Sequence, residues 1–174
     1  MRMMMKLAGI LSASLLMTGC VIVADVNDDG EDNLRIGNVF GKSLAASSLS
    51  KSKRSYKSFE ATLADLSTAI DKRGLKTFAV VDHAAAAASV DKTLPPTTLV
   101  IFGNPKAGTP LMKERRSIGM ALPLKAMVWE KGDKIFVTIT DIDGLASAYN
   151  IDEADGVIEK IGDTLAAVLV EATE

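Results

Sequence analysis

The chain has a single cysteine, Cys20, and a single histidine, His83. One thiol near the N-terminus leaves the rest of the chain without a disulfide, so the fold must rest on a hydrophobic core. A metal site built on one histidine would need carboxylates, and the neighbouring Asp82 is poorly placed to share a metal with it. The chain also has no Gly-x-Ser-x-Gly elbow and no cysteine–histidine couple. These motifs are typical of enzymes with a serine or cysteine nucleophile, and their absence leaves no such nucleophile to propose. We predict no metal site and no cofactor.

Excess positive charge is absent as well. The formal net charge is −2, and loss of an N-terminal leader containing Arg2 and Lys6 would take it to about −4. Such a chain has no overall attraction to a polyanion, so we expect no nucleic-acid partner. Apolar residues make up 48% of the sequence, which is enough for one domain to bury a core.

The N-terminal residues have the pattern of an export signal. Residues 1–6 are basic without an acid, and residues 7–17 are apolar or small throughout. This apolar run of about 11 residues is short for a membrane-spanning helix, which needs about 20. We therefore interpret it as a signal segment.

The next four residues, Met17-Thr18-Gly19-Cys20, resemble the lipobox of bacterial lipoproteins, with Met17 in place of the usual leucine. The resemblance implies cleavage after residue 19 and attachment of diacylglycerol to the Cys20 sulfur. A plain secretory signal with a free thiol and an uncleaved anchor remain alternatives. Val21 stands where aspartate would resemble an inner-membrane retention mark, which favours the outer membrane, facing the periplasm.

Residues 20–52 have the composition of a flexible tether. The first part is acidic and rich in turn formers, and the part after Ser43 is rich in serine and lysine. The run Asp25-x-Asn27-x-Asp29-Gly30 matches the first half of a calcium loop, but the twelfth position is Ile36 instead of the required glutamate. We therefore favour a solvated linker over a calcium site.

Residues 53–174 are predicted to form one α+β domain, a curved and mainly antiparallel sheet of four to five strands backed by two main helices. Phe59, Leu63, Leu66 and Ile70 recur at helical spacing, which predicts a helix over 59–73. A second helix is predicted over about 154–170. Strands are predicted over 76–81, 97–102, 125–129 and 134–140, with short helices over 84–88 and 110–116.

Two motifs carry a resemblance to a known family. They are Val81-Asp82-His83-Ala84-Ala85-Ala86 and the run from Ile101-Phe102-Gly103-Asn104-Pro105 to Thr109-Pro110-Leu111-Met112. With Leu122-Pro123-Leu124-Lys125 and Val128-Trp129-Glu130, they resemble the domain-of-unknown-function family 302 over about residues 53–150. The resemblance implies a curved antiparallel sheet backed by helices, often paired as a dimer. It implies no reaction.

The candidate site combines His83 with the loop after the 97–102 strand. As a histidine, His83 could bind an anion or move a proton, or it could simply fix a turn by hydrogen bonding. The loop of residues 103–110 is rich in glycine and proline, so its N–H groups could cradle an anion, although its spacing is not that of a P-loop. We predict a ligand pocket formed by His83, Phe102, Gly103, Asn104, Pro105, Gly108, Thr109, Pro110 and Met112.

The preferred function is a lipid-anchored envelope module that binds a small ligand without catalysis, possibly as a homodimer. One alternative is a lipoprotein that binds another envelope protein through its surface. The other is an enzyme that uses His83 as its acid/base group. Asp141 and Asp143, after the last predicted strand, are interpreted as turn residues rather than as a catalytic pair.

Overall fold

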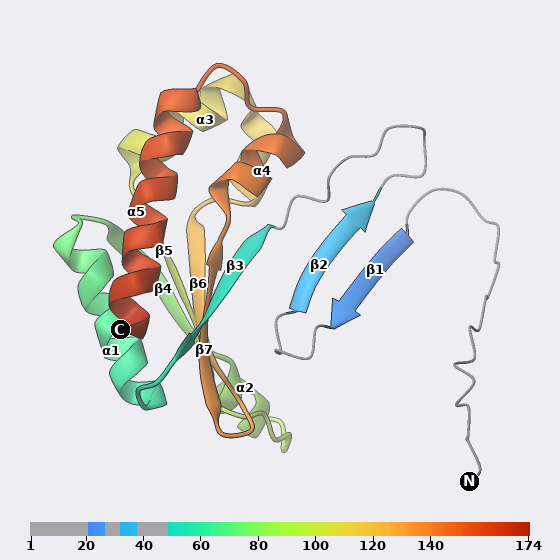
Figure 1. The fold of residues 1–174 in the computed structure, drawn as a ribbon, viewed down its shortest axis with the longest axis vertical. Helices are drawn as coiled ribbons and strands as arrows, with labels where there is room; N and C mark the ends of the chain where they lie inside the picture. Colours follow the sequence, from blue (N-terminus) through green and yellow to red (C-terminus); the bar gives the residue numbers. More distant parts are fainter. Residues whose placement is uncertain (1–20, 27–31, 38–48) are drawn as a thin grey trace, which may run out of the picture.

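The computed structural model describes residues 21–26, 32–37 and 49–174, with side chains for the last range (Figure 1). The predicted signal segment and Cys20 lie outside the described residues. Two strands of the predicted tether, β1 (Val21–Val26) and β2 (Asp32–Gly37), pair antiparallel in a sheet of their own. Asp25 and Ile36, the ends of the calcium-like run, lie in these strands.

The main sheet has five antiparallel strands in the order β3-β7-β6-β5-β4. Their bounds are β3 Ser50–Ser55, β4 Lys76–Asp82, β5 Thr97–Gly103, β6 Leu124–Lys131 and β7 Lys134–Thr140. The β6–β7 hairpin turns at Gly132, whose φ of 62° suits a residue without a side chain. The α+β class with a mainly antiparallel sheet is confirmed.

Strand β3 begins within the segment predicted as tether. Its residues are serine, lysine and arginine, so it lacks the apolar alternation that marks a half-buried strand. It forms because tertiary partners satisfy its polar groups. Ser52 Oγ lies 2.7 Å from Thr138 Oγ1, and Lys53 Nζ lies 2.8 Å from a carboxylate oxygen of Glu174.

Two long helices, α1 (Phe59–Lys72) and α5 (Asp155–Thr173), pack together on one face of the sheet (Figure 1). The helix predicted over 59–73 is confirmed as α1. It begins after the N-cap Ser58, whose hydroxyl accepts from Ala61 N at 3.2 Å, and is followed by Gly74 at φ 64°. Alternate residues of β5 and β6 face the helices. They are buried with α1 and α5 residues in a single core: Val100, Phe102, Ala126, Val128, Leu66, Ile70, Leu165 and Val168.

Shorter helices fill the connections. They are α2 (His83–Ala88), α3 (Pro105–Glu114), the 3-10 helix η1 (Arg116–Met120) and α4 (Ile142–Tyr149). The helix predicted over 110–116 was placed too far along the sequence, because α3 begins at Pro105, directly after the N-cap Asn104. Helix α4 was not predicted. It begins behind Asp141, whose side chain accepts from Asp143 N at 3.3 Å.

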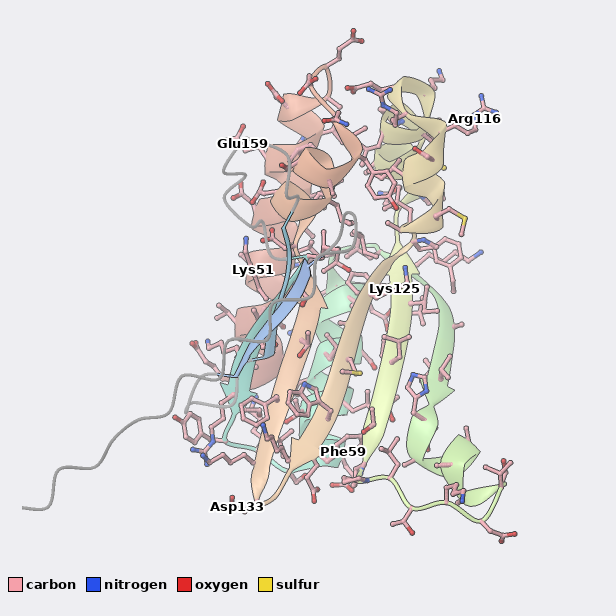
Figure 2. All side chains as sticks on the ribbon, turned by 90° about the vertical axis from the view of Figure 1, so that its right-hand side faces the viewer. Lys51, Phe59, Arg116, Lys125, Asp133 and Glu159 are labelled. Carbon is pink, nitrogen blue, oxygen red and sulfur yellow. The ribbon has the colours of Figure 1, made fainter. Side chains whose placement is uncertain are left out.

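The other face of the sheet has no helix over it in the described part of the chain. Figure 2 looks onto this face, with α1 behind the strands. Leu99, Ile101, Met127 and Trp129 lie here half-buried, and Phe136 stacks on Trp129 with ring centroids 4.9 Å apart. We call these five residues the uncovered face.

Candidate functional site

A cavity of about 750 Å³ opens where α3 and α5 meet the ends of β5 and β6. Strand β5 contributes its last residue, Gly103, and β6 contributes Leu124 after the turn at Pro123. The remaining lining comes from the residues that follow α1, from β4, and from η1. The cavity therefore lies among segments far apart in the sequence.

The walls of this cavity are mainly apolar. Their large members are Leu75, Phe78, Met112, Leu122, Val157, Ile161 and Leu165. Phe78 is the extra residue of a β-bulge in β4, between Thr77 and Ala79, and the residue is 44% exposed. A side chain of this size at the cavity mouth offers a surface for an apolar ligand.

Two glycines of the short helices lie against cavity residues. A Cβ added to Gly108 of α3 would lie 3.7 Å from Leu122 Cδ1 and 4.0 Å from Met112 Cε, in ordinary contact. A Cβ on Gly119 of η1 would lie 3.4 Å from Met112 Sδ. Because Gly108, Leu122 and Met112 all line the cavity, any longer side chain at position 108 would occupy part of it.

The charged side chains that line the cavity are all cationic: Arg73, Lys106 and Lys160. Arg73 Nη1 already has two partners, Glu171 Oε2 at 2.8 Å and Ala69 O at 2.8 Å. Hydrogen bonds from Lys72 and then from Arg73 hold the pKa of the Glu171 carboxyl below its usual range. Lys106 and Lys160 are exposed and form no ion pair with the described residues.

The loop predicted to cradle an anion is the N-terminus of α3 instead. The Asn104 side chain accepts from Lys106 N at 2.9 Å, while the Asn104 carbonyl accepts from Ala107 N and Gly108 N. Pro105 has no N–H group. The N–H groups of residues 106–108 are therefore already paired, so the cationic side chains are the better anion partners.

His83 does not belong to this cavity. It begins α2, at the far end of β4 from Lys76, which pairs with the cavity residue Gly103. Strand β4 has seven residues, so the two ends are about 20 Å apart at about 3.3 Å per residue. The side chain that organises this turn is Asp82, which accepts from Ala85 N at 2.8 Å. His83 is half-buried beside it. The structure therefore does not bring His83 and the 103–110 loop together in one pocket.

The other predicted site residues separate into two groups. Gly103, Asn104, Pro105, Gly108, Thr109 and Met112 line the cavity. Phe102 is fully buried in the core on the helix side of β5, and neither it nor Pro110 lines the cavity. Sequence reasoning missed the opposite wall. On α5, Val157, Ile161 and Leu165 recur every four residues, and this spacing is the signal that could have placed them on one face.

No group of three histidine, cysteine, aspartate or glutamate residues within the described ranges is arranged to hold a metal ion. Asp141 and Asp143 both approach Lys51 Nζ, at 3.0 and 3.6 Å. The hydrogen bond to Asp141 is the main reason that the pKa of Lys51 is raised. With Asp141 also capping α4, these two carboxylates have structural partners.

Half of this chain is similar in sequence to part of some curated proteins. Proteins named fluoride-specific ion channel FluC 1, from Brucella suis and Brucella abortus, are each 42% identical to this chain over 88 residues. The match covers 50% of this chain but only 35% and 33% of those proteins. The chain thus spans about a third of the curated relatives it matches. Among its described residues, no helix is both long enough and apolar enough to cross a membrane.

A solved structure agrees over more of the chain. It is the crystal structure of an uncharacterized conserved DUF302 protein from Bacillus stearothermophilus, with a TM-score of 0.65 and 15% sequence identity. The match covers 71% of this chain and 98% of that one, and shows a shared fold. The family model described as domain of unknown function DUF302 matches residues 51–171. The chain belongs to the DUF302 family.

Proposed function

We propose that this protein is a non-catalytic binding module that takes a small, mainly apolar molecule into the cavity between α3 and α5. The observation that carries the proposal is the cavity itself. At about 750 Å³ it lies within the range of about 300–1,000 Å³ typical of small-molecule sites. Its mainly apolar wall, with a few polar groups, is also typical of such sites.

The chemistry of the wall supports binding rather than catalysis. Among the described residues, the titratable side chains that line the cavity are Arg73, Lys106 and Lys160. No carboxylate or imidazole of the described residues is itself a lining residue, and the carboxylate nearest to these cations, that of Glu171, is paired with Lys72 and Arg73. The wall therefore lacks the free acid/base couple that proton-transfer catalysis uses. His83 belongs to the other end of β4.

The direct test of this function is titration with a neutral apolar probe. N-phenyl-1-naphthylamine should bind to the whole protein with one saturable site, measured by its rise in fluorescence. Gly108→Leu should abolish that rise, because the new side chain enters the cavity beside Leu122 and Met112. Gly156→Leu is the matched control, since the space around that helical glycine is open.

A second blocking variant keeps the test decisive. Val157→Trp alters the opposite wall on α5, and circular dichroism of both variants would report whether they fold. Probe binding that is unchanged in both folded variants, or no binding by the wild type, would overturn the proposal.

We also propose that the module works at a membrane surface, held by lipid on Cys20 and facing the periplasm from the outer membrane. The support is the lipobox-like run Met17-Thr18-Gly19-Cys20 after a basic and apolar leader. Two or more acyl chains give stable anchoring where one chain binds only reversibly. The similarity to part of two proteins named as ion channels is consistent with a setting at a membrane.

A second candidate function is protein association through the uncovered face, with a second copy of this chain as the partner. Two cations beside this face, Arg54 and Lys125, already have partners within the protein. Arg54 lies 4.8 Å from the Tyr56 ring centroid, and Lys125 Nζ donates to the carbonyls of Ala121 and Pro123. The middle of the face is therefore apolar and presents no net charge of one sign to a copy of itself.

Sedimentation velocity tests this second candidate. We expect concentration-dependent dimers of the wild type, and monomers for Met127→Asp in the middle of the face. Val90→Asp, which alters an exposed residue after α2 and outside the face, should still dimerise. A wild type that stays monomeric up to high micromolar concentration would contradict this association.

A further inference from the structure

We infer that the ligand of the cavity is an amphipathic monoanion, an alkyl chain ending in a carboxylate, whose head binds between Lys106 and Lys160. This inference rests on the proposed function and specifies its ligand. The apolar walls of α3, α5 and Phe78 would hold the chain, and the two ammonium groups would hold the head.

The first support is the sign of the charges at the cavity. The chain as a whole is slightly acidic, with a net charge of −2, yet each charged residue that lines the cavity is a cation. Helix α5 makes the contrast sharpest. None of its acidic residues lines the cavity, whereas its one basic residue, Lys160, does. The acids of α5 are Asp155, Glu159, Asp163 and Glu171.

The second support is that, among the charged and hydroxyl side chains of the lining, the two lysines are the ones still free to bind a ligand. The hydroxyls of Thr109 and Thr164 donate to backbone carbonyls one turn earlier, both at 2.7 Å. Arg73 is held by Glu171. Lys106 and Lys160 keep all three ammonium protons free of partners among the described residues, so an anionic head is the group that these donors favour.

The third support is the position of Lys106 in its helix. It lies in the first turn of α3, which contains no acidic residue. A cation there opposes the helix dipole, because the N-terminus of a helix favours negative charge. A bound carboxylate beside Lys106 would remove that conflict. An unfavourable local arrangement of this kind, which no other residue of the protein offsets, is expected where a protein binds a ligand.

The test compares ligands with one chain length and different heads. Dodecanoate should displace N-phenyl-1-naphthylamine about tenfold more tightly than methyl dodecanoate, which corresponds to one charge-assisted contact. Dodecyltrimethylammonium should bind more weakly than the ester. Acetate and inorganic phosphate, which have a charge and no chain, should not displace the probe at equal concentration.

The variants locate the head group. Lys106→Gln combined with Lys160→Gln should lower dodecanoate affinity to that of the ester, and leave ester affinity unchanged. Lys113→Gln is the matched control, an exposed lysine of α3 that does not line the cavity. It should bind dodecanoate as the wild type does.

The outcomes separate this inference from the proposed function. Equal affinity for dodecanoate and its ester, or an unchanged preference in the double variant, would overturn the inference while leaving an apolar-ligand module. Tighter binding of dodecyl phosphate than of dodecanoate would overturn the carboxylate assignment. Failure of every apolar probe, neutral or charged, would overturn the proposed function, and the inference with it.

Discussion

Arg73 and Glu171 join the end of α1 to the last turn of α5, with Nη1 2.8 Å from Oε2. Lys72 Nζ also donates to the other oxygen of the same carboxylate. The last residue of α1 and its C-cap, two consecutive cations, therefore share one acid of α5. One of them, Arg73, is also a cavity residue, so this pair fixes part of the cavity wall while it holds the helices together.

Replacing Glu171 should change how stability depends on pH. Its pKa is lowered in the folded state, first by Lys72 and then by Arg73, so its contribution is full above the unfolded value and is lost as the pH falls through the folded one. We expect the wild type to lose more stability than Glu171→Gln between pH 6 and pH 3 in urea unfolding. Glu159→Gln, on the same helix without an ion pair in the described structure, should follow the wild type. Parallel pH profiles for all three proteins would contradict the role of this carboxylate.

Alanine at two glycines should have opposite effects on stability. Gly108 lies in α3 without a positive φ, and a Cβ there meets only ordinary contacts, so Gly108→Ala should stabilise the fold by up to about 1 kcal/mol. Gly74 has a φ of 64°, where a Cβ costs about 1–2 kcal/mol, so Gly74→Ala should destabilise it. Chemical denaturation of both variants checks the pair. A shift of the same sign in both would refute the backbone argument.

A buried hydroxyl pair should be costly to break on one side. Ser55 Oγ and Thr62 Oγ1 lie 2.7 Å apart, and both residues are buried where β3 leads into α1. Thr62→Val keeps the shape but leaves Ser55 without this partner, so we expect a loss of about 1–3 kcal/mol in the free energy of unfolding. Adding Ser55→Ala should cost less than the sum of the two single changes, which a double-mutant cycle would measure. Simple additivity would mean that the hydroxyls do not interact.

Cys20→Ser should release the protein from the membrane. Without the thiol no thioether to diacylglycerol can form, so the variant should leave the membrane fraction of its host. Intact-mass measurement of the wild type should show a chain that begins at Cys20 and carries the added lipid. A wild-type chain that keeps residues 1–19, or begins without lipid, would refute the anchor. The fold of residues 49–174 would not be affected.

The main elements of the fold could be predicted because their periodicity is local. Helix α1 follows from Phe59, Leu63, Leu66 and Ile70 at helical spacing, and β7 from its alternating apolar residues. Strand β3 could not be predicted in this way. Its polar residues become a strand only through partners on β7 and at the other end of the chain.

One wall of the candidate site, the segment after β5, could be predicted from the sequence. The glycine and proline residues after β5 indicated a special backbone, and most of them do line the cavity. The opposite wall comes from α5, more than 40 residues away, and nothing local to the Gly103 segment indicates which helix will cover it. His83 was predicted as a site residue from its chemistry alone. Its distance from the cavity is set by the length and direction of β4, which the residue type does not reveal.

The bulge at Phe78 has a consequence for the free edge of the sheet. Strand β4 is hydrogen-bonded to β5 on one side only, so its outer N–H and C=O groups are a template onto which another extended chain could be added. One extra residue bends the strand and disrupts that template. Deleting Phe78 would restore a regular edge and remove a cavity wall in a single step. We expect this deletion variant to bind the apolar probe less tightly and to self-associate by pairing of its edge strands.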